Sequence, residues 1–304
     1  MLGPTASGKT LLACQLAYHL NGEIISADSR QVYKKLNIGT GKDLKEYKIK
    51  GEKIPYHLID ICDANTQFYL HDFIRELKKC FIDISVRCHI PIICGGTGLY
   101  LEALEKDHSL TQIQENHERR KELNELSREE LIKLFREIKS PPTQKAIIPV
   151  KDDIETDSKK RIIRRIEIAE YLKDHPLPEK QENIYKPKYI GVKITKEERN
   201  KRIDARLKYR LENGLIEEVE GLLKKGVSHE RLQFLGLEYK FISFYLLKQI
   251  NKKELFTQLS TAIHQFAKRQ MTWYRRMEKH GIEIEWVELE NAEQLISSLK
   301  DSRQ

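Results

Sequence analysis

A phosphate-binding loop opens the sequence and constrains the fold more than any other feature. The pattern G-x-x-x-x-G-K-[S/T] is matched at every defined position by Gly3, Pro4, Thr5, Ala6, Ser7, Gly8, Lys9 and Thr10. In such a loop the backbone N–H groups turn inward, and the helix that follows directs its positive end at the bound anion. Lys9 adds a point charge, and the hydroxyl of Thr10 suits Mg²⁺. The sequence therefore predicts a diphosphate site, with Mg²⁺ as cofactor and Thr10 as its ligand.

Short apolar runs separated by helical patterns predict the rest of the fold. They occur at residues 23–26, 57–62, 90–94 and 189–194, with a last β-rich run at residues 282–289. This alternation is typical of parallel strands with helices between them. We therefore expect an α/β fold with a P-loop NTPase-like parallel sheet flanked by helices.

The strand that should lead into the phosphate-binding loop is short in this sequence. Only Met1 and Leu2 precede Gly3, whereas a strand usually runs about five residues. We therefore expect a start that lacks most of this strand.

A change in the type of sequence pattern divides the chain. Between about Lys106 and Lys186 the strand signals end, and charged helical stretches take their place. We expect a helical insertion domain over residues 111–185. Residues 1–110 and 186–304 are expected to form the P-loop catalytic core.

Composition indicates which partners and which cellular compartment suit the protein. The 304 residues include 54 Lys and Arg against 46 Asp and Glu, a net charge of +8. Such an excess attracts a polyanion where it is clustered, but it also suits a well-solvated surface. The five cysteines are odd in number and have no C-x-x-C spacing, which favours reduced thiols. No apolar run approaches the length of a membrane span, and we expect a monomeric protein of the cytoplasm.

The phosphate-binding loop indicates a diphosphate but not a reaction, because kinases, hydrolases and transferases share it. The D-x-x-G and N-K-x-D motifs of GTPases are missing from the sequence, and so is a Walker B run of four apolar residues before an Asp. Asp60 is the nearest approximation to a Walker B carboxylate. It would equally serve to cap a turn.

Four further segments resemble the tRNA dimethylallyltransferase family in order and spacing. They are residues 28–33 (DSRQVY), 39–43 (GTGKD), 95–100 (GGTGLY) and 267–273 (AKRQMTW). Residues 234–239 (FLGLEY) match another segment of that family more loosely, and their aromatic residues would equally suit a core. With the phosphate-binding loop, the four segments form a specific combination that spans nearly the whole chain.

The resemblance implies attack by the N6 amine of an adenosine on dimethylallyl diphosphate, with release of diphosphate. An exocyclic amine is a poor nucleophile, so a carboxylate must accept its proton as the new bond forms. The resemblance implies Asp28 as this general base and Thr97 as a catalytic residue that holds the adenosine. Both residues would also suit the N-cap of a helix.

Charge on the leaving diphosphate also needs neutralisation. Thr195 and Glu198 form a capping-box pattern, after which Arg199, Arg202 and Arg206 follow at helical spacing. The resemblance selects Arg206, together with residues 3–10, for the diphosphate. Arg199 and Arg202 would equally lie on a solvated basic face.

The resemblance also implies contacts with the anticodon stem-loop of tRNA. The first set of contacts lies in the expected catalytic core and contains Asp28, Ser29, Arg30, Gln31 and Thr97. The second set lies in the expected insertion domain and contains Lys160, Arg161, Ile162, Ile163 and Arg164, with Arg119 as a more distant contact. A run such as residues 159–165 is often only a solubilising helix face, and this alternative stays open beside phosphate binding.

Three other functions fit part of the sequence. An adenylate isopentenyltransferase would share the loop and Asp28, but it needs neither a helical insertion nor a basic cluster. A small-molecule kinase would leave residues 28–31 and 269–273 unexplained. A P-loop protein that binds nucleic acid without catalysis would yield no prenylated product from tRNA and dimethylallyl diphosphate.

Overall fold

The structure is a computed structural model that describes residues 1–106, 108–139, 154–179 and 183–301. Its Cα positions divide into two compact units. We call Met1–Leu104 with Tyr185–Gln304 the core unit, and Glu105–Ile184 the insertion unit. Each unit contains a hydrophobic core of its own.

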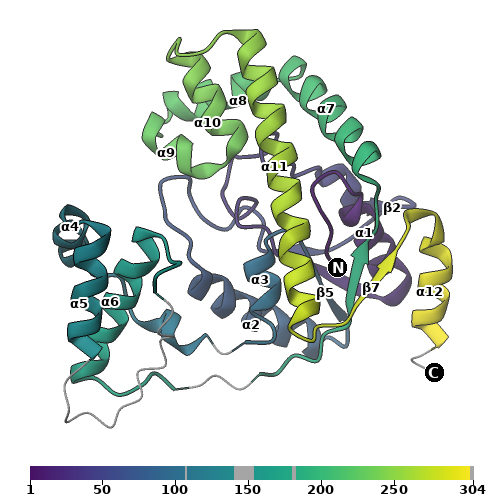
Figure 1. The fold of residues 1–304 in the computed structure, drawn as a ribbon. Helices are drawn as coiled ribbons and strands as arrows, with labels where there is room; N and C mark the ends of the chain where they lie inside the picture. The colour runs from purple at the N-terminus through teal and green to yellow at the C-terminus, as the bar shows by residue number, and fades with distance from the viewer. Residues whose placement is uncertain (107, 140–153, 180–182, 302–304) are drawn as a thin grey trace. The chain divides into compact units, whose positions relative to one another are not determined.

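The first part of the core unit alternates helices and strands (Figure 1). Its elements are α1 (Lys9–Leu20), β1 (Gly22–Ser26), η1 (Leu44–Tyr47), β2 (Lys48–Ile49), β3 (Glu52–Lys53), β4 (Tyr56–His57), α2 (Leu70–Val86), β5 (Ile90–Cys94) and α3 (Gly98–Glu102). The second part is mostly helical. Its elements are β6 (Tyr189–Val192), α7 (Lys196–Glu212), α8 (Leu215–Lys224), α9 (His229–Leu235), α10 (Leu237–Leu246), α11 (Lys252–Lys279), β7 (Ile284–Val287), η3 (Leu289–Asn291) and α12 (Ala292–Asp301).

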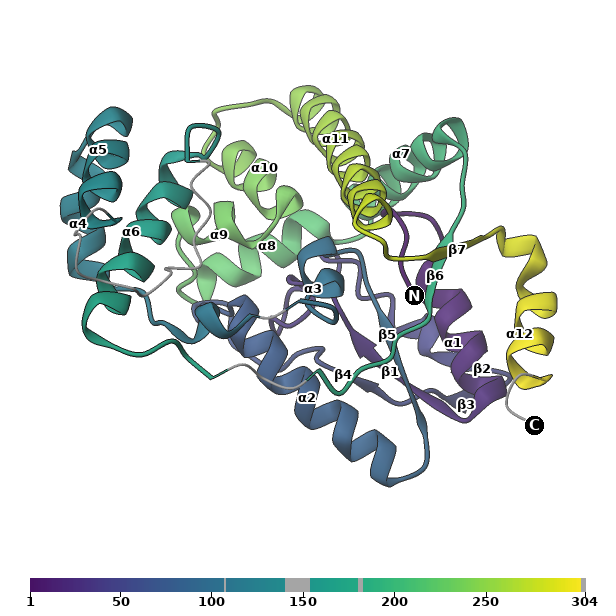
Figure 2. The ribbon, with the colours of Figure 1, turned by 60° about the horizontal axis from the view of Figure 1, so that its bottom comes forward.

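Parallel strands form the central sheet, as the sequence predicted (Figure 2). β1 lies between β4 and β5, and β6 pairs with β7. The strands predicted at residues 23–26, 90–94, 189–194 and 282–289 are confirmed within one or two residues at each end. The strand predicted at residues 57–62 was wrong beyond His57, because Leu58 and Asp60 have positive φ angles of 61° and 56° that end the extended conformation.

Met1 and Leu2 occupy the place of the strand that leads into the phosphate-binding loop. Leu2 makes parallel bridges to Gly95 on one side and to Gly191 on the other. Its N–H donates to the carbonyl of Ile190 at 2.8 Å, and its carbonyl accepts from the N–H of Val192 at 2.9 Å. Leu2 therefore joins the β4-β1-β5 strands to β6 and β7 in one parallel arrangement.

Helices cover both faces of this sheet. Successive strand residues point to opposite faces, and Ile24 and Ile25 of β1 are both fully buried. Ile24 packs in a cluster with side chains of α1 and α12, whereas Ile25 packs with side chains of α2, α3 and α11. The predicted α/β fold is thus confirmed.

A helical layer formed by α7 to α11 completes the core unit. Tyr239 and Leu255 are fully buried within it. Half of the predicted capping box of α7 is present: the hydroxyl of Thr195 accepts a hydrogen bond from the N–H of Glu198 at 3.2 Å, whereas the carboxylate of Glu198 pairs with Arg202. This layer matters for function because α7, α10 and α11 contribute side chains to the candidate site.

The insertion unit is helical in its described residues. It contains η2 (Ser109–Gln112), α4 (His117–Glu125), α5 (Arg128–Lys139) and α6 (Lys159–Asp174). Phe135 of α5 and Ile162 and Ile166 of α6 are buried in its core. An ion pair between Arg120 and the buried Glu167, 2.8 Å apart, links α4 to α6.

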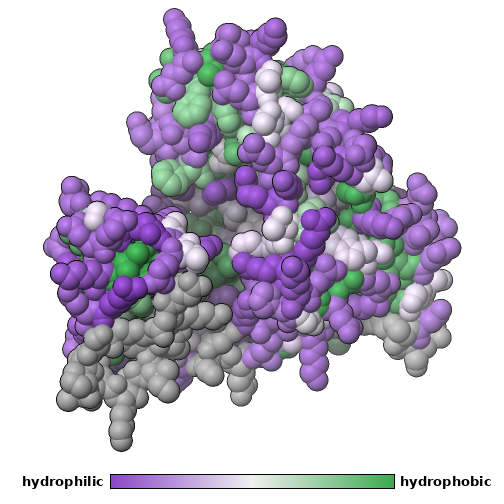
Figure 3. All heavy atoms as spheres, viewed as in Figure 1, coloured by the Kyte–Doolittle hydropathy of each residue, from purple (hydrophilic) through white to green (hydrophobic). Residues whose placement is uncertain are grey.

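The visible surface is predominantly hydrophilic, with small scattered apolar areas (Figure 3), in keeping with a composition that is 33% charged. Within the described ranges, no helix is both long and apolar enough to cross a membrane. The cysteines are all free thiols, as expected from their spacing.

Candidate active site

The phosphate-binding loop connects Leu2 to α1, which begins at Lys9 as the motif predicted. Gly8 caps the helix in the left-handed region, with φ 86°, and Ala6 also has a positive φ of 64°. These angles turn the chain sharply just before α1, so that a loop with backbone N–H groups leads directly into the N-terminus of the helix. Such an arrangement binds phosphate groups through N–H donors and the helix dipole.

Two cations lie with this loop in the candidate site. Burial lowers the pKa of Lys9. Arg206 of α7 donates a hydrogen bond to the hydroxyl of Thr5, and burial together with nearby Arg210 lowers the pKa of Arg206 to about 10. Burial and neighbouring positive charge both disfavour the charged forms of Lys9 and Arg206. A bound anion offsets both effects because its negative charge stabilises the two cations. The site is therefore suited to a multiply charged anion such as diphosphate.

The other arginines of α7 differ in their surroundings. Arg202 also lines the pocket, where it pairs with Glu198. Arg199 is buried, and its guanidinium donates to the side chain of Asn200 at 3.1 Å. Arg210, which the sequence analysis missed, lies 3.3 Å from Asp43 and lines the same pocket. Its position one helical turn after Arg206 is the signal that could have revealed it.

Asp28 follows the carboxyl end of β1, where ligands gather in parallel sheets. Its Oδ1 accepts hydrogen bonds from the N–H of Arg30 at 2.8 Å and from that of Gln31 at 3.4 Å. These bonds close a turn rather than cap a helix, because no helix starts after Asp28. The turn fixes a carboxylate that lines the pocket.

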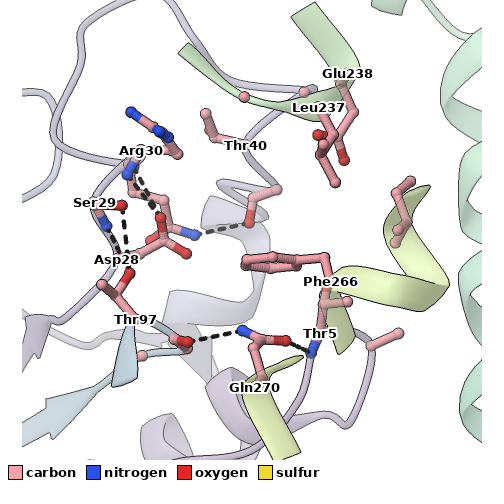
Figure 4. A pocket seen from close by; sticks show the side chains of 18 of the residues that line it. Thr5, Asp28, Ser29, Arg30, Thr40, Thr97, Leu237, Glu238, Phe266 and Gln270 are labelled. Atoms are coloured by element: carbon pink, nitrogen blue, oxygen red, sulfur yellow. Dashed lines mark hydrogen bonds between the residues drawn. The ribbon is translucent and has the colours of Figure 1, made fainter. Parts of the chain in front are cut away.

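Thr97 follows β5 and occupies the N-cap position of α3, but its side chain makes no capping bond. Its Oγ1 instead accepts from the N–H of Ser29 at 3.1 Å (Figure 4). The structure thus brings together Asp28, Ser29, Arg30 and Thr97, which the sequence analysis had grouped by resemblance.

Gln31 ties this turn to the next pocket loop. Its Nε2 donates to the carbonyl of Gly41 at 3.2 Å, and its Oε1 accepts from Ser26 at 3.0 Å. Residues 37–39 are in turn held by Glu218 of α8, whose carboxylate accepts from their three N–H groups at 2.8 to 3.1 Å. The carboxylate also accepts from the hydroxyl of Tyr239 at 2.7 Å. The loop of residues 39–43 is therefore anchored from two sides.

These segments enclose one pocket of about 750 Å³, which lies entirely within the core unit. The phosphate-binding loop, Asp28, Thr97 and Arg206 all line it. Phe266 projects from α11 into this pocket, and Leu237 and Glu238 approach it from α10 (Figure 4). The pocket thus combines an anion site, a carboxylate and apolar surface, which suits a ligand with a diphosphate and a hydrocarbon group.

The donor atoms in this pocket fit Mg²⁺ held mainly by a substrate. Thr10 lines the pocket with Asp43 and Glu46, and burial and then Asp43 raise the pKa of Glu46. Within the described part of the chain, no cluster of three or more His, Cys, Asp or Glu is placed to hold a metal. Mg²⁺ commonly takes one or two protein oxygens, with phosphates and waters as its other ligands. Asp60 is not placed as a Walker B residue, since it pairs with Lys42 at 2.6 Å.

The predicted tRNA-binding residues of the insertion unit fall into three groups. Lys160 and Arg161 of α6 are exposed. Arg164 donates to the carbonyl of Ile113 at 2.6 Å, and Arg119 pairs with Glu170 at 2.7 Å. The side chains of Ile162 and Ile163 are buried in the core of the unit, because they lie on the apolar side of α6. The exposed pair remains open to solvent, although Arg161 also lies 3.8 Å from the carboxylate of Asp157.

Comparison with known proteins agrees with this arrangement. The model of the IPP transferase family matches residues 31–277, and that of the isopentenyl transferase family matches residues 1–57. A tRNA dimethylallyltransferase 2 of Bacteroides fragilis is 45% identical over 288 residues, which cover 95% of this chain and 91% of that protein. A tRNA dimethylallyltransferase 1 of Azobacteroides pseudotrichonymphae is 46% identical over 290 residues, covering 95% and 92%.

A solved structure has a similar fold. The crystal structure of a tRNA isopentenylpyrophosphate transferase from Bacillus halodurans superimposes with a TM-score of 0.67 at 28% identity. The match covers 99% of this chain and 94% of that one. Since one family model and both relatives extend over most of the sequence, this chain belongs to the IPP transferase family.

Proposed function

We propose that this protein transfers a dimethylallyl group from dimethylallyl diphosphate to N6 of the adenosine immediately 3′ of the anticodon in tRNA, releasing diphosphate. The observation that carries the proposal is the meeting of the phosphate-binding loop and Asp28 in one pocket. The loop suits the leaving group of the donor, and the carboxylate suits the proton of the acceptor. The relatives at 45% and 46% identity are named tRNA dimethylallyltransferases.

The donor half of the pocket would stabilise the departing diphosphate. As the bond between C1 and oxygen breaks, negative charge builds on the diphosphate and the allylic carbon gains positive charge. Preformed N–H donors and cations are most effective where charge develops in the transition state. The N–H groups at the N-terminus of α1, together with the side chains of Lys9 and Arg206, would fill this role. Mg²⁺, held by Thr10 and diphosphate oxygens, would supply further charge neutralisation.

The acceptor half would activate the adenosine amine. The N6 nitrogen attacks C1, so the N6–C1 bond forms while the C1–O bond breaks, and one N6 proton moves to Asp28. The Oδ1 atom is already held by the N–H of Arg30 at 2.8 Å, so we assign proton acceptance to Oδ2. A turn that fixes the carboxylate in this way lowers the cost of aligning base and nucleophile.

An adenosine can react here only if it leaves the base stack. Bases of a single-stranded loop are unstacked at small cost and bind to aromatic side chains. Phe234 lines the pocket and is 68% exposed, which provides such a surface for a neighbouring base. Thr97 and the loop of residues 28–31 would then contact the target nucleotide.

Lys160 and Arg161 of the insertion unit would contact tRNA phosphates. Both side chains are exposed on α6, and cations of this kind bind nucleic acid by releasing its counterions. Arg119 and Arg164 would act differently, since their bonds to Glu170 and to Ile113 stabilise the unit itself. Ile162 and Ile163 would support the exposed cations from the core beneath them.

An adenylate isopentenyltransferase is the second candidate, because the isopentenyl transferase model matches residues 1–57. Such an enzyme prenylates a free nucleotide and has no use for an insertion unit of exposed cations. The acceptor therefore distinguishes the two functions.

Mass spectrometry of nucleosides provides the test. The protein is incubated with Mg²⁺, dimethylallyl diphosphate and an unmodified tRNA transcript that has adenosine 3′ of the anticodon. A matched transcript with guanosine at that position and free AMP serve as the other acceptors. We expect N6-dimethylallyladenosine only from the first transcript. Product from AMP alone would favour the second candidate, and no product from any acceptor would contradict both.

A further inference from the structure

Gln270 of α11 links the two halves of the pocket through its side-chain amide. Its Oε1 accepts from the N–H of Thr5 at 2.8 Å, and its Nε2 donates to the carbonyl of Gly96 at 2.8 Å (Figure 4). Thr5 lies in the phosphate-binding loop, whereas Gly96 precedes Thr97. The residue is only 6% exposed, so water does not compete strongly for either bond.

The packing around this amide is tight. A Cβ atom on Gly96 would lie 2.3 Å from Nε2 of Gln270, which only glycine avoids. One helical turn later, Tyr274 is fully buried, and its hydroxyl donates to the carbonyl of Gly3 at 3.1 Å. α11 therefore fixes both the start of the phosphate-binding loop and the loop of residues 95–97.

These bonds continue to the carboxylate. Thr97, next to Gly96, accepts from the N–H of Ser29 at 3.1 Å. Ser29 follows Asp28, whose Oδ1 accepts from Arg30. On the donor side, Thr5 also accepts from Arg206. Hydrogen bonds and the short backbone links between them thus connect Arg206, the proposed diphosphate contact, through Gln270 to the turn that holds Asp28.

We propose that Gln270 is a positioning residue that sets the separation between the donor diphosphate and the acceptor adenosine. The catalytic part of this inference rests on the proposed function. Productive transfer requires the reacting atoms about 3 to 3.5 Å apart, and an error of about 1 Å can cost about 10²-fold in rate. An amide suits the task because it provides one acceptor and one donor on the same planar group. A hydrocarbon side chain would fill the space but leave the Thr5 N–H and the Gly96 carbonyl without these partners.

Kinetics of two variants test the catalytic part. In Gln270→Leu, kcat should fall on the order of 10²-fold, while KM for donor and for tRNA stays within about threefold. Thr272→Ala is the matched control, because its exposed hydroxyl bonds only within α11, to the carbonyl of Lys268. The control should match wild type in kcat. Wild-type kcat in a folded Gln270→Leu variant, checked by thermal melting, would overturn the inference and leave the proposed function intact.

Gln270→Glu adds a readout that simple packing would not produce. A protonated carboxyl donates to the Gly96 carbonyl, but an ionised one repels it. The ratio of variant to wild-type kcat should therefore rise toward one as the pH falls. Taking this ratio at each pH cancels the titration of shared groups around the pocket, which include Lys9, Asp28, Cys94, Arg206, Arg269 and Tyr274. A ratio independent of pH would contradict the donor role of the amide.

Hydrogen exchange tests the link without any tRNA. Inorganic diphosphate should slow exchange of the Ser29 N–H in wild type, because order in the phosphate-binding loop passes through Gln270 to Thr97. In Gln270→Leu the Thr5 N–H should exchange faster, and diphosphate should no longer slow Ser29. Equal protection of Ser29 in both proteins would overturn the inference, whether or not wild type prenylates tRNA.

Discussion

In the proposed reaction, one side chain, that of Asp28, has both a structural and a chemical task. Its Oδ1 closes a turn by accepting from the N–H of Arg30 at 2.8 Å, while the same carboxylate lines the pocket opposite the phosphate-binding loop. A carboxylate fixed by backbone donors is already oriented before substrate arrives, which is the condition for efficient proton transfer. The structural and the chemical role can therefore be separated by a change that preserves shape.

Asp28→Asn is such a change. The amide oxygen still accepts from Arg30, so the turn should persist, but the amide cannot accept the N6 proton. We expect single-turnover prenyl transfer to fall about 10²- to 10⁴-fold, with tRNA affinity nearly unchanged in a binding titration. Asp63→Asn provides the control, since Asp63 is a surface carboxylate with a side chain 78% exposed. Full activity in Asp28→Asn would remove this residue from the mechanism.

Glu23 shows a purely structural use of charge. It lies in β1 with its side chain 4% exposed, and it accepts from His57 and His89 at 2.6 Å each. Burial opposes ionisation of this carboxyl, but the hydrogen bonds from His57, Arg87 and His89 outweigh it and lower its pKa to about 2. A lowered pKa stabilises the fold above the unfolded value of 4.5, and this contribution is lost as the pH falls from there toward 2.

Glu23→Gln should therefore destabilise the protein most at neutral pH. The loss in free energy of unfolding at pH 7 should be on the order of 3 kcal/mol. The difference from wild type should shrink steadily below about pH 4.5, since the wild-type carboxyl also becomes protonated there. Urea denaturation of both proteins across this pH range measures the difference. A difference that stays constant with pH would show that packing, not charge, holds this cluster.

At the scale of elements, α6 shows that one basic sequence pattern can contain both exposed cations and an arginine that bonds within the fold. The run of residues 159–165 predicted a basic helix with an apolar side, and both properties are present. The pattern could not distinguish the exposed cations from Arg164, whose side chain turns to the carbonyls of Leu110 and Ile113. Those acceptors lie more than 50 residues away in sequence, so only the folded unit identifies them.

Lys160→Ala with Arg161→Ala tests the exposed pair alone. If both contact phosphates, the log–log slope of tRNA affinity against salt should flatten by about 1.5 to 2 units, just under one unit per contact. Diphosphate binding should not change. Lys133→Ala is the matched control, because this lysine is also an exposed cation of the insertion unit, on α5. An unchanged slope in the folded double variant would mark the pair as a solvated helix face.

The elements that the sequence could predict are those that depend on local patterns. The start of α1, the N-cap of α7, and strands β1 and β5 depend on local patterns, and all were predicted correctly. The expected strand after His57 was lost because Asp60 turns to pair with Lys42, a contact no local pattern encodes. Arg210 and Gln270 were missed as site residues for a related reason. Their partners Asp43, Thr5 and Gly96 lie in distant segments.

For the whole molecule, the division into two units has an energetic consequence. The buried side chains of the insertion unit form a cluster separate from those of the core unit. Units with separate cores can lose stability separately, since a cavity destabilises mainly the residues that surround it.

Phe135→Ala tests this independence. Phe135 is 1% exposed in the core of the insertion unit, and truncation of such a residue costs about 3 to 5 kcal/mol. Hydrogen exchange in α6 should accelerate, while calorimetry should show unchanged binding of inorganic diphosphate to the core unit. Phe73→Ala in α2, also fully buried, should give the reverse result. Loss of diphosphate binding in Phe135→Ala would show that the two units unfold together.

The position of Leu2 between Gly95 and Gly191 also sets an order of events during synthesis. A ribosome releases the chain from its N-terminus, and domains tend to fold as they emerge. The whole insertion unit, residues 105–184, leaves the ribosome after Gly95 but before Gly191. It can fold while Leu2 still lacks one neighbour and the nascent sheet keeps an open edge. The phosphate-binding loop is thus made before the insertion unit, but it acquires its final surroundings only after Gly191 has emerged.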